Sequence, residues 1–130
     1  MPLYTIFAEH GSISDNTKAE IAQEITRTHA EVMKVPKSFV RVVFLSYASG
    51  CGYTAGEKAR TVAMNCVLRA GHPAQEKNDM LKRLWSMFQQ LAGVATEQLA
   101  ISLQEIPASS AMEMTNHASS EARVARSYGT

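Results

Sequence analysis

The sequence contains few of the residues that would indicate a cross-linked, metal-bound or membrane-embedded protein. Only Cys51 and Cys66 are present, without the CxxC or Cys/His spacing of a zinc site. Two cysteines give no disulfide framework, which favours a reducing, cytoplasmic location. No run approaches the roughly 20 apolar residues of a membrane span, and the first residues lack the pattern of a secretory signal. We therefore expect no metal site and no membrane partner.

The charge of the chain also excludes a class of partner. Thirteen Lys and Arg residues against twelve Asp and Glu residues give a net charge of +1, and no basic cluster exceeds what a solvated helix carries. Nucleic acid is therefore not an expected partner. With 130 residues, of which 45% are hydrophobic, we expect one globular domain that recognises a small molecule or a protein.

The first 47 residues alternate between strand and helix patterns. The segment LYTIFA predicts a strand over Leu3–Ala8, and Ser14 is the expected N-cap of a helix. Along that helix, apolar positions and one histidine recur at three- and four-residue spacing: Ile21, Ala22, Ile25, His29, Val32 and Met33. KVPKS then ends the helix, and FVRVVFLSY predicts a strand over Phe39–Tyr47.

The second half repeats this order. Residues 48–60 contain three glycines and predict a loop or short hairpin. A strand is expected over Thr61–Leu68, a helix over Ala74–Ala92 with Gly93 at its C-terminal cap, and a strand over Leu99–Ile106. Sliding this half back by 59 positions lays GVATEQLAISL over KVPKSFVRVVF, which indicates a pseudo-repeat.

The repeat predicts an α/β (α+β) fold made of two tandem β-α-β units. Because parallel β-α-β crossovers are right-handed, both helices are expected on one face of a four-stranded sheet. The opposite face is then uncovered, so we expect an oligomer that buries it. We predict a single domain over residues 1–107, with halves at 1–47 and 61–107, a linker or hairpin at 48–60, and a tail at 108–130 that carries Glu113.

Pro2 is the first candidate for chemistry. If Met1 is removed, Pro2 presents a secondary amine at the start of a strand. An unperturbed α-amino group titrates near about 7.7–8, close to the pH at which it would exchange protons usefully. Proline is also simply tolerated at the first position of a strand.

The turn after the third predicted strand offers a carboxylate site. Arg69 ends that strand just before a helix, so its guanidinium and the amides of the helix start both favour an anion, with His72 as a third donor. Both residues also fit an ordinary surface turn.

His29 lies in the apolar stripe of the first helix, where a histidine is more often a core residue than a catalytic one. Cys51, Cys66 and His10 have no partners at useful spacing and are interpreted as structural.

This combination of features resembles the tautomerase superfamily, and within it the branch of cis-3-chloroacrylic acid dehalogenase. The segments that carry the resemblance are MPLYTIF, ITRTHAEV, LRAGHPA and EIPASSAMEM. The resemblance implies that Pro2 is the catalytic proline, His29 the histidine of the first helix and Arg69 a carboxylate-binding arginine. It also implies that Glu113 activates water.

The resemblance further implies a homotrimeric, cofactor-independent isomerase or dehalogenase-hydratase that acts on a small carboxylate. Two positions depart from the dehalogenase pattern: His72 stands where a second arginine is expected, and Ser102 where a tyrosine would assist the water. Loss of a guanidinium weakens the polarisation of the substrate, although a protonated His72 would partly replace it. Proton transfer beside a carbonyl needs fewer residues than dehalogenation: Pro2 to carry the proton and Arg69 to bind the carboxylate.

Three interpretations of function follow. The chain is an amino-terminal-proline enzyme that transfers protons and adds water to small unsaturated or enolisable carboxylates, or a simple enol-keto tautomerase in which His29 and Glu113 are idle. The third is a non-catalytic trimeric binding protein. Retention of Met1 would favour the third, because an acylated Pro2 nitrogen is neither acid nor base.

Overall fold

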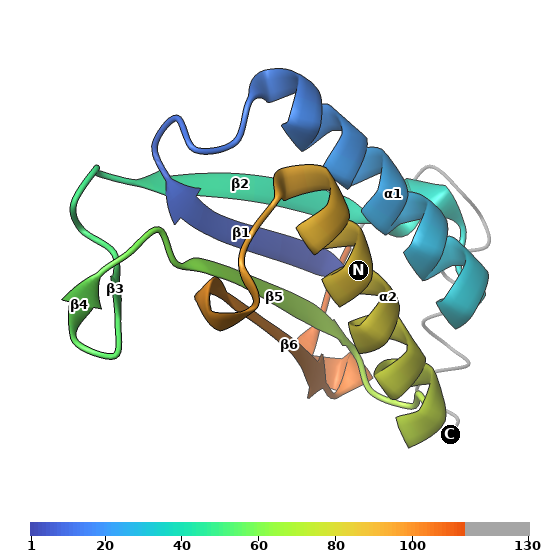
Figure 1. Ribbon diagram of the computed structural model, residues 1–130. Coiled ribbons are helices and arrows are strands. Elements are labelled where there is room, and N and C mark those ends of the chain that lie inside the picture. The colour runs from blue at the N-terminus through green and yellow to red at the C-terminus, as the bar shows by residue number, and fades with distance from the viewer. Residues whose placement is uncertain (114–130) are drawn as a thin grey trace.

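The computed structural model describes residues 1–113, in which the strand, helix, strand order occurs twice (Figure 1). The first half consists of β1 (Leu3–Glu9), α1 (Asp15–Met33), the 3-10 turn η1 (Lys37–Phe39) and β2 (Arg41–Tyr47). A hairpin follows, formed by β3 (Tyr53–Thr54) and β4 (Glu57–Lys58). The second half consists of β5 (Val62–Arg69), α2 (Ala74–Ala92), η2 (Thr96–Gln98), β6 (Leu99–Ile106) and η3 (Ala108–Ser110).

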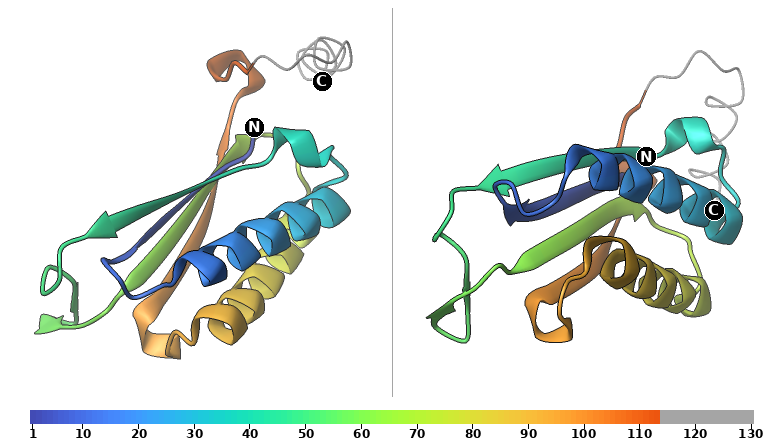
Figure 2. Two further views of the ribbon diagram at one scale, coloured as in Figure 1. Left: turned by 90° about the horizontal axis from the view of Figure 1, so that it is seen from above. Right: turned by 45° about the horizontal axis from the view of Figure 1, so that its top comes forward.

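The four long strands form one mixed sheet in the order β2-β1-β5-β6. Within each half the two strands are parallel, whereas β1 and β5 pair antiparallel at the centre, with Tyr4 opposite Cys66. Both helices lie on one face of this sheet (Figure 2). The predicted β-α-β repeat and its four-stranded sheet are therefore confirmed.

Alternation along the strands decides which residues enter the core. Every second residue of β1 and β5 faces the helices and is buried, as are the apolar stripes of α1 and α2. The fully buried members of this core are Tyr4, Ile6, Ile21, Ile25, Met64, Cys66, Leu68, Met80, Leu84 and Phe88. Neither helix is long and apolar enough to cross a membrane, within the residues described.

Local signals set the ends of both helices. The Ser14 hydroxyl caps α1 by accepting a hydrogen bond from the Thr17 amide at 3.2 Å, as the sequence predicted. Gly93 takes the left-handed conformation after α2, with φ of 67°, and its amide donates to the Gln89 carbonyl at 2.8 Å. Both helices are 19 residues long.

The second strand begins two residues later than the predicted Phe39. After Pro36, the Val40 amide closes a 3-10 turn on the Lys37 carbonyl at 3.1 Å, and Phe39 is buried instead of pairing with a strand. β2 starts at Arg41, whose amide donates to the Pro2 carbonyl at 3.1 Å. The ends of β1 and β5 also differ by one residue from prediction, because pairing partners rather than local pattern define them.

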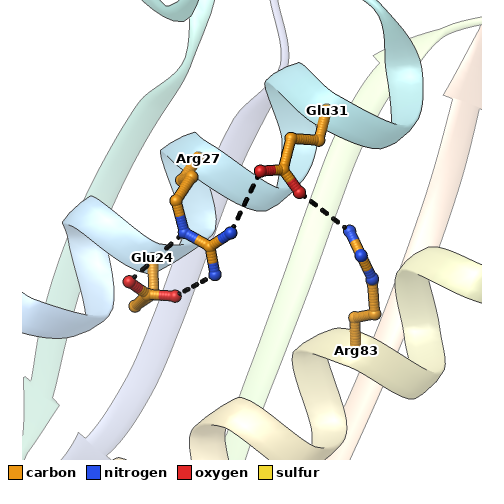
Figure 3. Close-up of polar contacts among 4 residues, drawn as sticks. All are labelled: Glu24, Arg27, Glu31 and Arg83. Carbon is orange, nitrogen blue, oxygen red and sulfur yellow. Dashed lines mark hydrogen bonds and ion pairs between the residues drawn. The ribbon is translucent and has the colours of Figure 1, made fainter.

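A charged network on the outer surface joins the two helices (Figure 3). Arg27 binds Glu24 at 2.6 Å and Glu31 at 3.1 Å within α1, and Glu31 binds Arg83 of α2 at 3.2 Å. These side chains are about half exposed, so solvent screens them and their contribution to stability is small. The network joins α1 to α2 through the ion pair between Glu31 and Arg83.

The sheet face opposite the helices is uncovered (Figure 2). Phe7, Val43 and Leu45 lie on it and are 42–44% exposed. Phe7 is opposite Leu45 on one side and Ala63 on the other, so an apolar band crosses the sheet. Such a band on a sheet face is typical of a protein interface.

Candidate active site

Three of the candidate residues, Pro2, Arg69 and Glu113, lie at one end of the sheet. β1 and β2 begin there, β5 and β6 finish there, and the β3-β4 hairpin lies at the opposite end (Figure 2). Pro2 is fully buried beside this end and its carbonyl accepts the Arg41 amide. Arg69 is the last residue of β5, opposite Ile106 of β6. The topology therefore brings the first residues of the chain close to the last residues of the second half.

Glu113 reaches this end because η3 redirects the chain after β6. Its carboxylate forms ion pairs with the Met1 amine, with Nη1 of Arg41 at 3.0 Å, and with Nη2 of Arg69 at 3.8 Å. Although it is charged, the Glu113 side chain is only 8% exposed. Three cations thus surround one carboxylate, and the excess of positive charge favours a further anion.

Arg69 is the most unusual group of the site. It is 4% exposed, and neither its Nε nor its Nη2 has a hydrogen-bond partner among the described residues. The 3.8 Å separation from Glu113 is an electrostatic contact, too long for a hydrogen bond. Unsatisfied guanidinium donors are costly to bury, and a ligand carboxylate is the group that would satisfy them through two parallel bonds.

Sequence reasoning missed Arg41. It is the first residue of β2, opposite Leu3 of β1, and its Nη1 also lies 3.4 Å from the Phe39 carbonyl. The available signal was its position: a parallel partner of β1 must start at the same end of the sheet as Pro2. Arg41 places a second guanidinium at the site, and in this structure Glu113 binds it.

His29 belongs to a buried polar cluster beneath the helices. It is 1% exposed, and its Nδ1 lies 2.7 Å from the hydroxyl of Tyr4, with the two rings in an edge-to-face arrangement. Cys66 lies opposite Tyr4 on β5 and also hydrogen-bonds with it. Burial raises the pKa of the Tyr4 hydroxyl far above its usual value and that of the Cys66 thiol to about 12, so both groups are neutral.

This cluster adjoins the N-terminus. Tyr4 follows Pro2 by two residues on the same strand. The pKa of Cys66 is raised by burial, against the opposing effects of the Tyr4 hydrogen bond and of the positive N-terminal amine, which lies close enough to act on the thiol. Tyr4 therefore links His29 to the end of the sheet that carries Pro2.

The turn between β5 and α2 differs from the anion site expected at the helix start. The amides of Gly71 and His72 donate to the Glu105 carboxylate, at 2.9 and 3.5 Å, and Lys77 forms an ion pair with it. The chain's own carboxylate thus occupies the turn. His72 directs its Nδ1 to Glu76, 3.3 Å away in the first turn of α2.

Ser102 lies elsewhere. It is exposed on the open face of the sheet, and its hydroxyl donates to the side-chain oxygen of Asn65 on the neighbouring strand at 2.8 Å. Within residues 1–113 no group of three or more His, Cys, Asp or Glu side chains is arranged to hold a metal ion.

The ion pair of Glu105 predicts a pH-dependent stability. Lys77 first, and then the turn amides, lower the pKa of Glu105 below its usual 4.5. The ionised Glu105 carboxylate therefore contributes its full stabilisation of the fold above pH 4.5. This contribution is lost as the pH falls through the lowered pKa. We expect Glu105→Gln to reduce Tm by about 2–5 °C at pH 7, and the difference from wild type to shrink below pH 4. Thermal unfolding measures this, with the exposed Glu57→Gln as control; a constant difference at all pH values would contradict it.

Comparison with known proteins gives the family. Residues 1–113 match Tautomerase_3, "Putative oxalocrotonate tautomerase enzyme". No curated protein matches the chain. The solved structure of native Ps01740 is similar, with 28% identity, a TM-score of 0.83, and coverage of 85% of this chain and 99% of that chain.

Two further solved structures share the fold. N1, a member of the cis-3-chloroacrylic acid dehalogenase family, has 24% identity and a TM-score of 0.83, covering 93% of this chain and 89% of that chain. A fused 4-OT symmetric trimer has 21% identity and a TM-score of 0.78, with coverage of 88% and 92%. With the match over residues 1–113, and with Pro2 and Arg69 at one end of a repeated β-α-β sheet, the chain belongs to the Tautomerase_3 family of the tautomerase superfamily.

Proposed function

We propose that this protein is an amino-terminal-proline enzyme that transfers protons on small unsaturated or enolisable carboxylates without a cofactor. The observation that carries the proposal is the buried guanidinium of Arg69, which has two nitrogens without hydrogen-bond partners within the described chain. It lies at the end of the sheet where the chain begins. A carboxylate bound there would hold the substrate next to Pro2.

The proposed active form lacks Met1. With Met1 present, the nitrogen of Pro2 is an amide and exchanges no proton, and the amine of Met1 is paired with Glu113. Removal of Met1 turns Pro2 into a secondary amine and takes one cation away from Glu113. The Pro2 amine can then take the proton of the enol hydroxyl and deliver it to the carbon at the other end of the enol double bond, which gives the keto form.

Water addition is the second part of the proposal. Glu113 and His29 would orient a water molecule for attack at the β-carbon, while Arg69 binds the carboxylate and protonated Pro2 supplies the α-proton. Arg41 supports this role of Glu113, because its guanidinium fixes one carboxylate oxygen at 3.0 Å. His72 is held by Glu76, so it adds less polarisation than a free guanidinium would.

A simple enol-keto tautomerase is the second candidate. The observation that favours it is Ser102, which stands where a water-assisting tyrosine is expected and instead binds Asn65 on the open face. In that case proton transfer by Pro2 and carboxylate binding by Arg69 are sufficient, and His29 and Glu113 have no part in the reaction.

Paired substrates test the proposal directly. Protein shown by intact mass to lack Met1 is expected to convert an enolised arylpyruvate, followed by ultraviolet absorbance, and to hydrate propynoic acid or dehalogenate a cis-3-haloacrylate. Pro2→Ala should lower kcat/KM at least about 100-fold, because it removes the secondary amine. Protein that retains Met1 should be inactive.

The outcomes separate the candidates. Turnover of the enol alone supports the simple tautomerase. Equal activity of the form that retains Met1 contradicts the role of Pro2, and no turnover of either substrate supports a non-catalytic trimer.

Glu113→Gln tests the division of roles. The amide keeps the shape of the side chain but removes the negative charge that would activate water. We expect hydration to fall at least about 100-fold more than enol-keto conversion, because only hydration uses a base at this position. Glu97→Gln, at an exposed position outside the site, is the matched control. Equal loss of both activities would assign Glu113 to substrate binding instead.

We further propose that the chain is a homotrimer whose open sheet faces meet. The uncovered apolar band of Phe7, Val43 and Leu45 supports this assembly, and the fused 4-OT neighbour with the same fold is described as a trimer. Phe7→Glu would place a charge in that interface and is expected to give monomers in sedimentation velocity. Gln90→Glu, on the exposed surface of α2, should leave the trimer intact. A monomeric wild type would refute the assembly.

A further inference from the structure

The hydroxyl of Tyr4 contacts His29, and the proposed reaction assigns no role to this contact. It lies 2.7 Å from Nδ1 of His29, a short distance for a hydrogen bond between oxygen and nitrogen. Both side chains are almost completely buried, and the edge-to-face packing of their rings limits how far either can rotate. The contact is therefore built into the core and does not depend on a mobile surface side chain.

The direction of this hydrogen bond follows from the chemistry of its neighbours. Tyr4 keeps its proton because burial raises its pKa, so it has one hydrogen to donate. Two acceptors compete for that hydrogen: the imidazole Nδ1 and the sulfur of Cys66. The thiol is neutral, since burial raises its pKa to about 12, and neutral sulfur is a weak acceptor. The hydrogen of Tyr4 therefore goes to Nδ1.

We propose that Tyr4 is a positioning residue that holds neutral His29 in the tautomer with its proton on Nε2. Nδ1 cannot carry a proton while it accepts one from Tyr4, so the ring proton must be on the other nitrogen. His29 then acts as a hydrogen-bond donor, and Glu113 is left as the base in water addition. This last assignment rests on the proposed function; the tautomer itself does not.

The tautomer is measured directly by long-range proton-nitrogen NMR correlation on protein with labelled histidines. The resonances of His29 are assigned from their absence in His29→Asn. At a pH where the ring is neutral, the wild type is expected to show the Nε2–H pattern. A predominant Nδ1–H pattern in the wild type would overturn the proposal without any need for a further variant.

Tyr4→Phe tests whether the Tyr4 hydroxyl is what fixes the tautomer of His29. It keeps the aromatic ring and removes only the hydroxyl, so we expect the Nδ1–H tautomer to appear in the spectrum of His29. Tyr47→Phe is the matched control, because it also removes one hydroxyl that forms a 2.7 Å hydrogen bond, to the Thr61 carbonyl outside the site. Cys66→Ala should leave the tautomer unchanged. An unchanged tautomer in Tyr4→Phe would overturn the proposal.

A kinetic measurement links the tautomer to the reaction. Tyr4→Phe is expected to lower kcat for water addition about 10- to 100-fold with little change in KM, as for other residues that orient a functional histidine. Tyr47→Phe should keep wild-type rates. If the wild type turns over neither substrate, the proposed function fails while the NMR result still decides the tautomer. If hydration proceeds but the tautomer is Nδ1–H, this inference alone fails.

Discussion

The antiparallel pairing of β1 with β5 decides which residues meet in this protein. Each half is a parallel strand, helix, strand unit, and by itself would place only the start of one strand beside the start of another. Because β1 and β5 run in opposite directions, with Leu3 opposite Val67, the beginning of the chain lies next to the end of β5. Pro2 and Arg69 lie at the same end of the sheet for this reason, although they belong to different halves. The tail that follows β6 leaves the sheet at the same end and brings Glu113 to them.

Positive charge exceeds negative charge at the end of the sheet that carries Arg69. Arg41, Arg69 and the terminal amine stand against the single carboxylate of Glu113. Burial removes water from Arg69, so its unsatisfied nitrogens gain more from an anion than an exposed arginine would. In the turn between β5 and α2, by contrast, the carboxylate of Glu105 is paired with Lys77 and with the turn amides. An anion bound at this end of the sheet would therefore be stabilised by two guanidinium groups.

Periodicity in the sequence was sufficient to predict both helices, the four long strands and the side of the sheet that the helices cover. Ser14 and Gly93 act through neighbouring backbone, so their capping roles were also predictable. The contacts that define the site were not, because they join distant residues: Arg41 meets Glu113 across 72 positions and Tyr4 meets His29 across 25. The interpretation of Phe39 as a strand residue was wrong because the chain after Pro36 forms a 3-10 turn, which delays the start of β2 to Arg41.

Glu113 and His29 belong to two separate polar clusters, one with Arg41 and Arg69 and the other with Tyr4. Glu113 is held by the guanidinium groups of Arg41 and Arg69 at one end of the sheet. His29 lies within the core, where it is 1% exposed and its Nδ1 contacts the Tyr4 hydroxyl at 2.7 Å. In the proposed water addition, Glu113 would accept a hydrogen bond from the water molecule and His29 would donate one to it. Because Ser102 stands where a tyrosine is expected, the proposed water addition would depend on Glu113 and on the proposed tautomer of His29 without help from a tyrosine hydroxyl.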